Sequence, residues 1–335
     1  MKFNRAYKLT INPNIGSPPI LLDENTINFN TKSYVISHPV IKEGNSIQPG
    51  LTIKFNVNRG FQVNNTATIE IYNLNAISRE YLLQDKFNIP YAIEGTDKKL
   101  QYRLVNLSAG YMGSDNNKTI FDNIFIGNIM EGGPQSQRPT LLTKLICQEN
   151  GYNNNGITSL FNKSYGKGAT LGDLVKDCLF QLNFNFQNLT VENLKKVLSK
   201  PLSPQTFMDN PLKILKHYFG DQFYIDNGEV FLVDNDEAVE GLVQVISAES
   251  GLSQESISRK DTLLEVKMTF EPRFILGQFV EIKSVITPQY NGAYKIVGIN
   301  HQGTISPAEP GDLITTLQLY IGQETAGGFK IIKSK

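Results

Sequence analysis

Alternating hydrophobic and polar positions dominate the two ends of the chain. Runs such as Leu51–Val57, Ala67–Tyr72 and Leu263–Phe270 place an apolar residue at every second position. Because successive side chains of a strand point to opposite faces, this period predicts strands with one buried face. Glycine and asparagine residues between the runs supply the turns. The pattern predicts β structure in residues 1–150 and again in residues 245–322.

Further strands and one short helix follow from the same reasoning. Within the first β region, Ile77–Leu83 breaks the alternation and places Ile77, Tyr81 and Leu82 on one face at helical spacing. That spacing predicts a short helix with one apolar face. The remaining strands are expected at Val35–Ser37, Tyr102–Leu107, Ile120–Ile129, Leu141–Gln148, Phe279–Val285, Tyr294–Ile299 and Asp312–Leu319.

Residues 151–244 change character from strands to helices. Leu171–Leu179 carries apolar residues at the spacing i, i+3, i+4, i+7 and i+8, which predicts an amphipathic helix. Thr170 is a candidate N-cap for it, and Asp173 completes a variant of the capping box. A second helix is expected over Asn210–Phe219.

A hairpin completes this middle module. Pro211 and Gly220 favour the start and the end of the second helix. The alternating run Phe223–Val233 is interrupted by Asn227 and Gly228, and an Asn-Gly pair between two apolar runs is a strong hairpin signal. The middle of the chain is therefore predicted to be a small α/β unit.

The whole chain is thus predicted to be mainly β with a small α/β insert. At 335 residues it is long enough for two or three compact domains. We divide it into a first β domain (1–150), a middle module (151–244), a second β domain (245–322) and a flexible C-terminal tail (323–335). The tail follows an Ala-Gly-Gly sequence, which favours flexibility.

Composition gives no sign of a charged partner or of a membrane. The 32 Lys and Arg residues balance the 32 Asp and Glu residues, so no net charge steers the molecule toward nucleic acid. Two cysteines, Cys147 and Cys178, lie in apolar runs and are interpreted as buried thiols. We find no signal peptide and no apolar run long enough to span a bilayer, which predicts synthesis in a cytoplasm and no membrane insertion.

The residues that could carry chemistry lack the spacing that catalysis or metal binding needs. His38, His217 and His301 are scattered, and His301 is interpreted as a structural histidine. Gly166–Gly168 precedes a helix but lacks the phosphate-loop spacing. Asp234–Glu237 lacks the calcium-loop spacing and is interpreted as a solvated turn. The sequence therefore predicts no catalytic, cofactor or metal residues, and no enzyme.

Several short phrases stand in a fixed order along the chain. Ala67–Asn75 resembles a strand that ends in an I-x-N-L corner, and Phe125–Ile129 resembles an F-x-G-x-I strand. Arg273–Ile282 is similar to an L-x-P-G-x-x-V-x-I strand, with Leu276 in place of the proline, and Asn291–Gly303 resembles an N-G-x-Y-x-V-x-x-V-x-H-x-G strand. In this order the phrases resemble the late-control and baseplate hub proteins of contractile phage tails.

The resemblance implies an architecture and a set of partners. It extends to the closing strand Leu313–Leu319, although the tryptophan often found there is missing. It implies that residues 1–150 and 245–322 are tube-like β-barrels, and that three chains form a ring of six barrels. Such a ring adapts a sixfold tail tube to a threefold spike and encloses a channel for DNA. The expected partners are two further copies of the chain, the central spike protein, a tail tube or tube-initiator protein, wedge proteins and the tape-measure protein, with DNA as transient cargo.

Two other functions stay open at this point. The 14 Tyr and 19 Phe residues could supply sugar-binding platforms for a carbohydrate-binding or host-recognition module, but tryptophan is absent. A tail-associated hydrolase would need a pair of carboxylates, and none is singled out. The hub interpretation implies a place in the virion tail baseplate after assembly in the host bacterial cytoplasm. The segment Phe329–Lys335 is a candidate for docking onto the spike.

Overall fold

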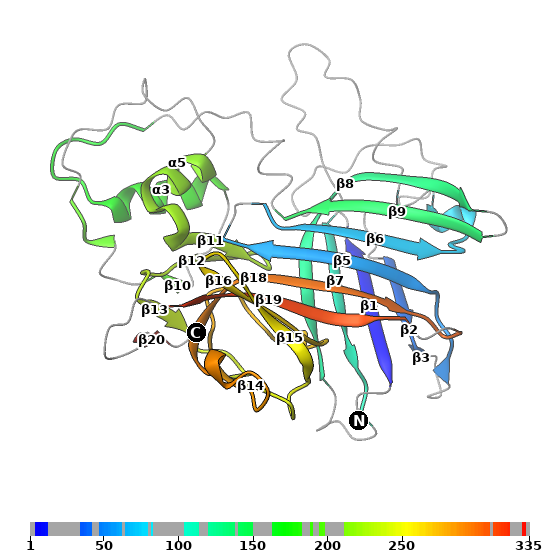
Figure 1. Cartoon of the computed structure of the whole chain (residues 1–335). Helices are drawn as coiled ribbons and strands as arrows, with labels where there is room; N and C mark the ends of the chain where they lie inside the picture. The colour runs from blue at the N-terminus through cyan, green and yellow to red at the C-terminus, as the bar shows by residue number, and fades with distance from the viewer. Residues whose placement is uncertain are drawn as a thin grey trace, which may run out of the picture.

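The computed structural model describes residues 4–12, 34–41, 47–61, 64–79, 82, 104–113, 120–137, 140–149, 163–182, 188–189, 194–197, 211–308, 311–321 and 330–332. Strands dominate both ends of the described chain, and the helices gather in its middle (Figure 1). The predicted fold class, mainly β with a small α/β insert, is confirmed.

The first β region follows the period-two pattern closely. In its strand β5, Ile53, Phe55 and Val57 are buried while the residues between them are exposed. These buried side chains join one hydrophobic core with the strands around them. The strands of this region are β1 (Arg5–Asn12), β2 (Tyr34–His38), β3 (Val40–Ile41), β4 (Ile47–Gln48), β5 (Ile53–Gly60), β6 (Thr66–Tyr72), β7 (Leu104–Tyr111), β8 (Ile120–Gln137) and β9 (Thr140–Gln148).

The second β region has its own core. Leu264, Val266 and Ile282 are fully buried there, together with apolar residues of the hairpin in the middle module. The elements of this region are β14 (Val245–Ser247), β15 (Leu252–Lys260), β16 (Leu263–Thr269), β17 (Phe279–Lys283), the short 3-10 helix η5 (Pro288–Tyr290), β18 (Gly292–Ile305) and β19 (Leu313–Ile321).

One sheet runs through both β regions. Its order is β15-β16-β19-β18-β5-β6-β9-β8-β7-β1-β2, with β17 beside β18 and β14 beside β17. Strands β5 and β18 pair antiparallel from Ile53 opposite Ile305 to Gly60 opposite Gly298. The resemblance implies two tube-like β-barrels at residues 1–150 and 245–322, and the hydrogen bonding joins these two β regions in one sheet.

The middle module contains the predicted helices and hairpin. Asp173 donates its backbone N–H to Thr170 Oγ1 (3.2 Å) and accepts the Thr170 N–H (3.0 Å), so the capping box is confirmed. Helix α5 begins at Pro211, one residue after the expected start, and Pro211 lies in its first turn as predicted. The elements are α3 (Leu171–Leu182), β10 (Asn188–Leu189), α5 (Pro211–Phe219), the 3-10 helix η4 (Gly220–Gln222), β11 (Phe223–Asp226), β12 (Glu229–Leu232) and β13 (Glu237–Val239).

The short helix after β6 is rotated relative to its prediction. Ile77 was expected on the buried face, but it is 71% exposed. Leu82 is buried as expected, and the buried face continues from it through Ser78 and Leu74 at four-residue spacing, which turns Ile77 outward. Tyr81, the third residue of the predicted face, lies outside the described residues.

The C-terminal segment also differs from its prediction. Residues 330–332, predicted as part of a flexible tail, form β20 (Lys330–Ile332). This strand pairs in parallel with β13, where Ile331 lies opposite Ala238. The pairing connects the C-terminal segment to the middle module, while residues 322–329 and 333–335 lie outside the described residues.

Candidate functional site

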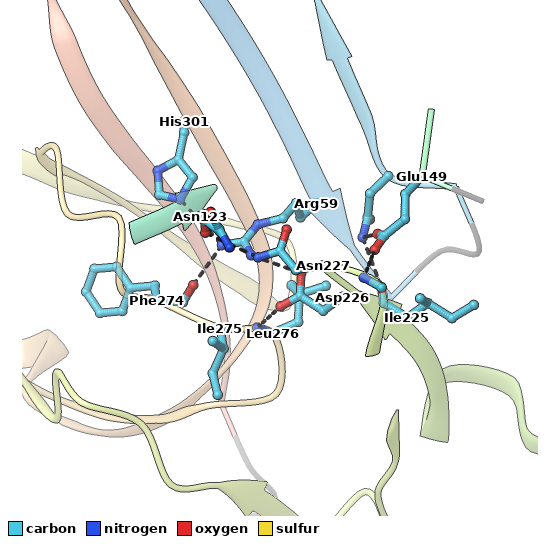
Figure 2. A network of polar contacts seen from close by, with 12 residues as sticks. Arg59, Asn123, Glu149, Ile225, Asp226, Asn227, Phe274, Ile275, Leu276 and His301 are labelled. Carbon is cyan, nitrogen blue, oxygen red and sulfur yellow. Dashed lines mark hydrogen bonds and ion pairs between the residues drawn. The ribbon is translucent and has the colours of Figure 1, made fainter. Parts of the chain in front are cut away.

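Charged side chains meet at a buried point where the two β regions and the middle hairpin touch (Figure 2). Arg59 extends from β5, Asp226 from the end of β11 and His301 from β18. Arg59 and Asp226 are each 4% exposed, and His301 is fully buried. We call this cluster, together with Glu149 and Asn65, the buried junction.

Arg59 and Asp226 form an ion pair that also ties in the second β region. Arg59 Nη1 donates to Asp226 Oδ1 at 3.0 Å, and Arg59 Nη2 donates to the Phe274 carbonyl oxygen at 2.7 Å. The other carboxylate oxygen of Asp226 accepts the Leu276 N–H at 2.9 Å. Burying two charges is unfavourable unless they are paired and hydrogen-bonded. The ion pair and these backbone contacts offset that cost, although Arg59 Nε is buried without a hydrogen-bond partner.

His301 completes the network as a neutral imidazole. Burial, and next the positive charge of Arg59, hold its pKa well below the ordinary value. Its Nε2 lies 3.4 Å from Arg59 Nη2, and its Nδ1 lies 2.9 Å from Thr315 Oγ1. Since Arg59 can only donate, the partners assign the proton to Nδ1. This geometry agrees with the interpretation of His301 as a structural residue.

Glu149 closes the other side of the junction. Its two carboxyl oxygens accept the Gly228 N–H and the Asn65 side-chain amide, each at 2.5 Å. Asn65 also donates to the Ile225 carbonyl oxygen at 2.9 Å, so β6, β9 and the hairpin are linked. Burial, and next the charge of Asp226, raise the pKa of Glu149 to about 8. Glu149 is therefore protonated at neutral pH.

The hairpin that enters this junction depends on residues with left-handed backbone. Asn227 (φ 53°) and Gly228 (φ 82°) form its turn, as the Asn-Gly signal predicts. Asn227 Nδ2 donates to the Asn123 carbonyl oxygen of β8 at 3.3 Å. The turn of the middle module is thus held against the first β region.

The close packing of the middle hairpin explains why a glycine stands at position 277. Gly277 has φ +76°, and a Cβ placed there would lie 2.1 Å from the Tyr224 hydroxyl oxygen. That hydroxyl donates to the Leu276 carbonyl oxygen at 3.2 Å. The glycine of the phrase Arg273–Ile282 is therefore required by the close approach of the middle hairpin.

The remaining sequence candidates do not come together. His38 accepts the Gly50 N–H at 3.0 Å, and His217 lies exposed on α5 beside Tyr218. Both cysteines are buried free thiols, as predicted, and burial raises the pKa of each to about 12.

The Asp234–Glu237 turn is only partly solvated. Asp234 accepts a hydrogen bond from Gln222 at 2.9 Å, whereas Glu237, at the start of β13, is 4% exposed. Within the described residues no group of His, Cys, Asp and Glu side chains could hold a metal ion.

The sequence reasoning missed the buried junction. One signal was present, because Arg59 occupies the next inward position after Ile53, Phe55 and Val57 in an alternating strand. A charged residue on a buried face calls for a partner. The identity of that partner could not be found from sequence, since Asp226 is 167 residues away.

Comparisons with known proteins agree with this architecture. The prophage MuSo2 43 kDa tail protein from Shewanella oneidensis is 9% identical, with a TM-score of 0.54 over 86% of this chain and 97% of that chain. The tail protein from Neisseria meningitidis MC58 is 8% identical, with a TM-score of 0.52 over 94% and 96%. These likenesses show the fold. No curated protein matches the sequence.

Within the described residues, no helix has the length and apolar character that crossing a membrane requires.

The family comparison goes further than the fold. A model of the family described as "Baseplate hub gp41" matches residues 36–304, which is most of the chain. The protein therefore belongs to the baseplate hub gp41 family and is a structural protein of the phage tail baseplate.

Proposed function

We propose that three copies of this chain form a ring that connects a sixfold tail tube to a threefold central spike. In this ring each copy contributes its two β regions, so three copies supply six β units around a central channel. DNA and the tape-measure protein pass through the channel, and wedge proteins surround the ring. The ring is built in the host cytoplasm and works without catalysis.

The observation that carries this proposal is the single sheet with two cores. Each β region has a hydrophobic core, with Phe270, Ile305 and Leu313 of the second region packed into the first core, and β5 and β18 hold both regions in one sheet. The buried junction adds side-chain contacts between them, through Arg59 and the Phe274 carbonyl oxygen. Two rigidly joined β units per chain suit this ring, because three chains then present three equivalent copies to the spike and six β units to the tube.

The position of the aromatic residues favours this function over sugar binding. The largest fully buried side chains include Tyr7, Tyr224, Phe55, Phe125 and Phe270. Sugar platforms need exposed aromatic faces, whereas these rings fill the cores. The junction likewise holds its carboxyl groups in structural hydrogen bonds, which supports a role in joining modules.

The proposal is tested by the mass of the purified full chain in solution. Light scattering at several concentrations, with and without the spike protein, measures the number of copies. The expected result is three copies per particle, alone or once the spike is added. A chain that remains monomeric with the spike present would contradict the ring.

A further inference from the structure

Exposed apolar side chains gather on one edge of the second β region. In residues 211–308 and 311–321, the large hydrophobic residues that are exposed are Leu242 (77%), Val245 (37%), Val285 (91%) and Ile286 (56%). The first two precede or begin β14, and the other two follow β17 after Ser284. Strands β14 and β17 pair in parallel, with Val245 opposite Glu281 and Ser247 opposite Lys283, so Leu242 and Val245 lie toward one end of this strand pair and Val285 and Ile286 beyond its other end. We call the margin along this pair the β14 edge.

The loop that carries Val285 and Ile286 is held firmly. Asn291 accepts the Ser284 N–H at 2.6 Å and donates to the Ser284 carbonyl oxygen at 3.1 Å. Thr287 donates its N–H and its hydroxyl to Ser284 Oγ at 3.1 and 2.9 Å. Both apolar side chains are therefore presented in a fixed position, which lowers the entropy cost of binding a partner.

The strand beside them has a free side in the described chain. Among the described strands β14 pairs with β17 alone. An unpaired strand edge offers N–H and C=O groups to a further strand, and natural proteins usually cover such an edge or place charges on it. Here the edge carries the exposed Val245 between Glu240 and Glu249, so a partner that pairs with it has to offer an apolar group and positive charge.

A complementary margin lies at the other end of the sheet. Strand β2 ends the sheet beyond β1, and its Val35 is 48% exposed. The described residues of this margin, 4–12 and 34–41, contain no acidic residue and two cationic ones, the exposed Lys8 and Arg5, whose guanidinium donates to the Thr304 and Gly311 carbonyl oxygens of its own chain. Residues 240–249 at the β14 edge contain Glu240 and Glu249 and no cationic residue. The two margins thus combine exposed valines with opposite charge.

Within one chain these margins cannot meet. Strand β17 pairs with β18 at Gly292–Lys295, whereas Arg5 of β1 donates to the carbonyl oxygen of Thr304, nearer the other end of β18. These points on β18 are nine residues apart, about 30 Å along a strand. A contact between the margins therefore has to join two molecules.

We infer that the β14 edge of one copy docks against the β1–β2 margin of the next copy. This head-to-tail contact uses two different surfaces, as ring closure by rotation requires. It rests on the proposed ring and names the surfaces that form it. Val245 and Leu242 pack beside Val35, and the acidic residues of the β14 edge lie against the margin that carries Lys8.

Cysteine cross-linking tests the contact in the full chain. The double variant Val35→Cys with Val245→Cys is treated with a short bis-maleimide, and each single variant is the control. The native thiols are buried with a pKa near 12, so they do not react. The double variant is expected to give linked dimers and trimers, while the single variants give none. Links in Val245→Cys alone, or none in the double variant, would overturn the inference.

Charge reversal provides a second test. Lys8→Glu and the pair Glu240→Lys with Glu249→Lys are each expected to shift the ring toward monomers by at least tenfold in concentration. The combined triple variant should restore most of the association. If every variant associates as the unmodified chain does, the β14 edge is not the contact between copies, although the proposed ring is not contradicted. If the unmodified chain never associates, even with the spike, both fail.

Discussion

Charged side chains lie inside at the buried junction, whereas apolar side chains lie outside at the β14 edge. At the junction, Arg59 and Asp226 are almost fully buried and bonded to each other and to the backbone. At the edge, Val285 and Ile286 are held in solvent by a hydrogen-bonded loop. Charged side chains usually lie at the surface and apolar ones inside, so the junction and the β14 edge each reverse the usual placement.

The difference shows where each region finds its partners. A buried charge needs its partners in the same chain, so the junction fixes how the three modules fit together. Exposed apolar groups on a rigid loop have no partner in the described chain, so they indicate a contact with another molecule. Changes at the junction should therefore affect folding, and changes at the edge should affect assembly.

Removing Asp226 should have the largest effect on stability. Asp226→Ala leaves the Arg59 guanidinium buried without its counter-ion and the Leu276 N–H without its acceptor. The expected loss is about 3–5 kcal/mol in the free energy of unfolding, measured by denaturant titration. Asp221→Ala, which removes an exposed ion pair with Lys216, is the control and should change it by less than about 1 kcal/mol. Similar effects of the two variants would refute a special role for the junction.

The next largest effect should come from Gly277. Gly277→Ala places a methyl group against the Tyr224 hydroxyl at a positive φ, with an expected loss of about 2–4 kcal/mol. In a Tyr224→Phe background the added cost should be smaller, because the hydroxyl is gone. Gly220→Ala is a matched control, since Gly220 also has a positive φ (+56°) and nothing lies within 4 Å of its Cβ position. Equal costs in both backgrounds would rule out the clash.

The pH dependence of stability tests whether Glu149 is protonated at the junction. The folded chain keeps the Glu149 proton up to about pH 8, while the unfolded chain loses it near the ordinary pKa of 4.5. Between these values the folded state binds more protons, so stability falls as pH rises, by at most about 1.4 kcal/mol per pH unit. Glu149→Gln should remove this slope in denaturant titrations from pH 5 to 8. An unchanged slope would mean that another group causes it.

The smallest stability effect is expected at the edge. Val285→Ser with Ile286→Ser should change the free energy of unfolding by less than about 0.5 kcal/mol, because both side chains already contact solvent. The same pair should weaken association of copies, measured by sedimentation. Phe180→Ser, at an 86% exposed position of α3, is the control and should leave association intact. If Phe180→Ser weakened association and the Val285→Ser with Ile286→Ser variant did not, the contact would lie on the middle module.

Local elements were predictable because their signals are local. The alternation in β5, the capping box at Thr170 and Asp173, and the Asn-Gly hairpin all depend on neighbouring residues. Strand β8 was predicted to end at Ile129, yet it continues to Gln137 through Pro134. Beyond Asn128 it no longer pairs with β7, and a proline without an N–H is tolerated on such an edge.

Long-range pairing could not be predicted in the same way. Alternation tells which face of β5 is buried, but not that β18, more than 200 residues later, lies beside it. The same holds for Glu149, whose partners Asn65 and Gly228 come from two other segments. The order of the family-like phrases did indicate the hub fold, although it carried no information about the buried junction.

The central claim, a ring of three chains with six β units, is tested most directly by electron microscopy of the assembled protein. The account predicts a threefold particle with six lobes around an open channel, in which the lobes of one chain are joined by density at the β5–β18 pairing. A ring with three lobes, or a particle without a channel, would contradict it.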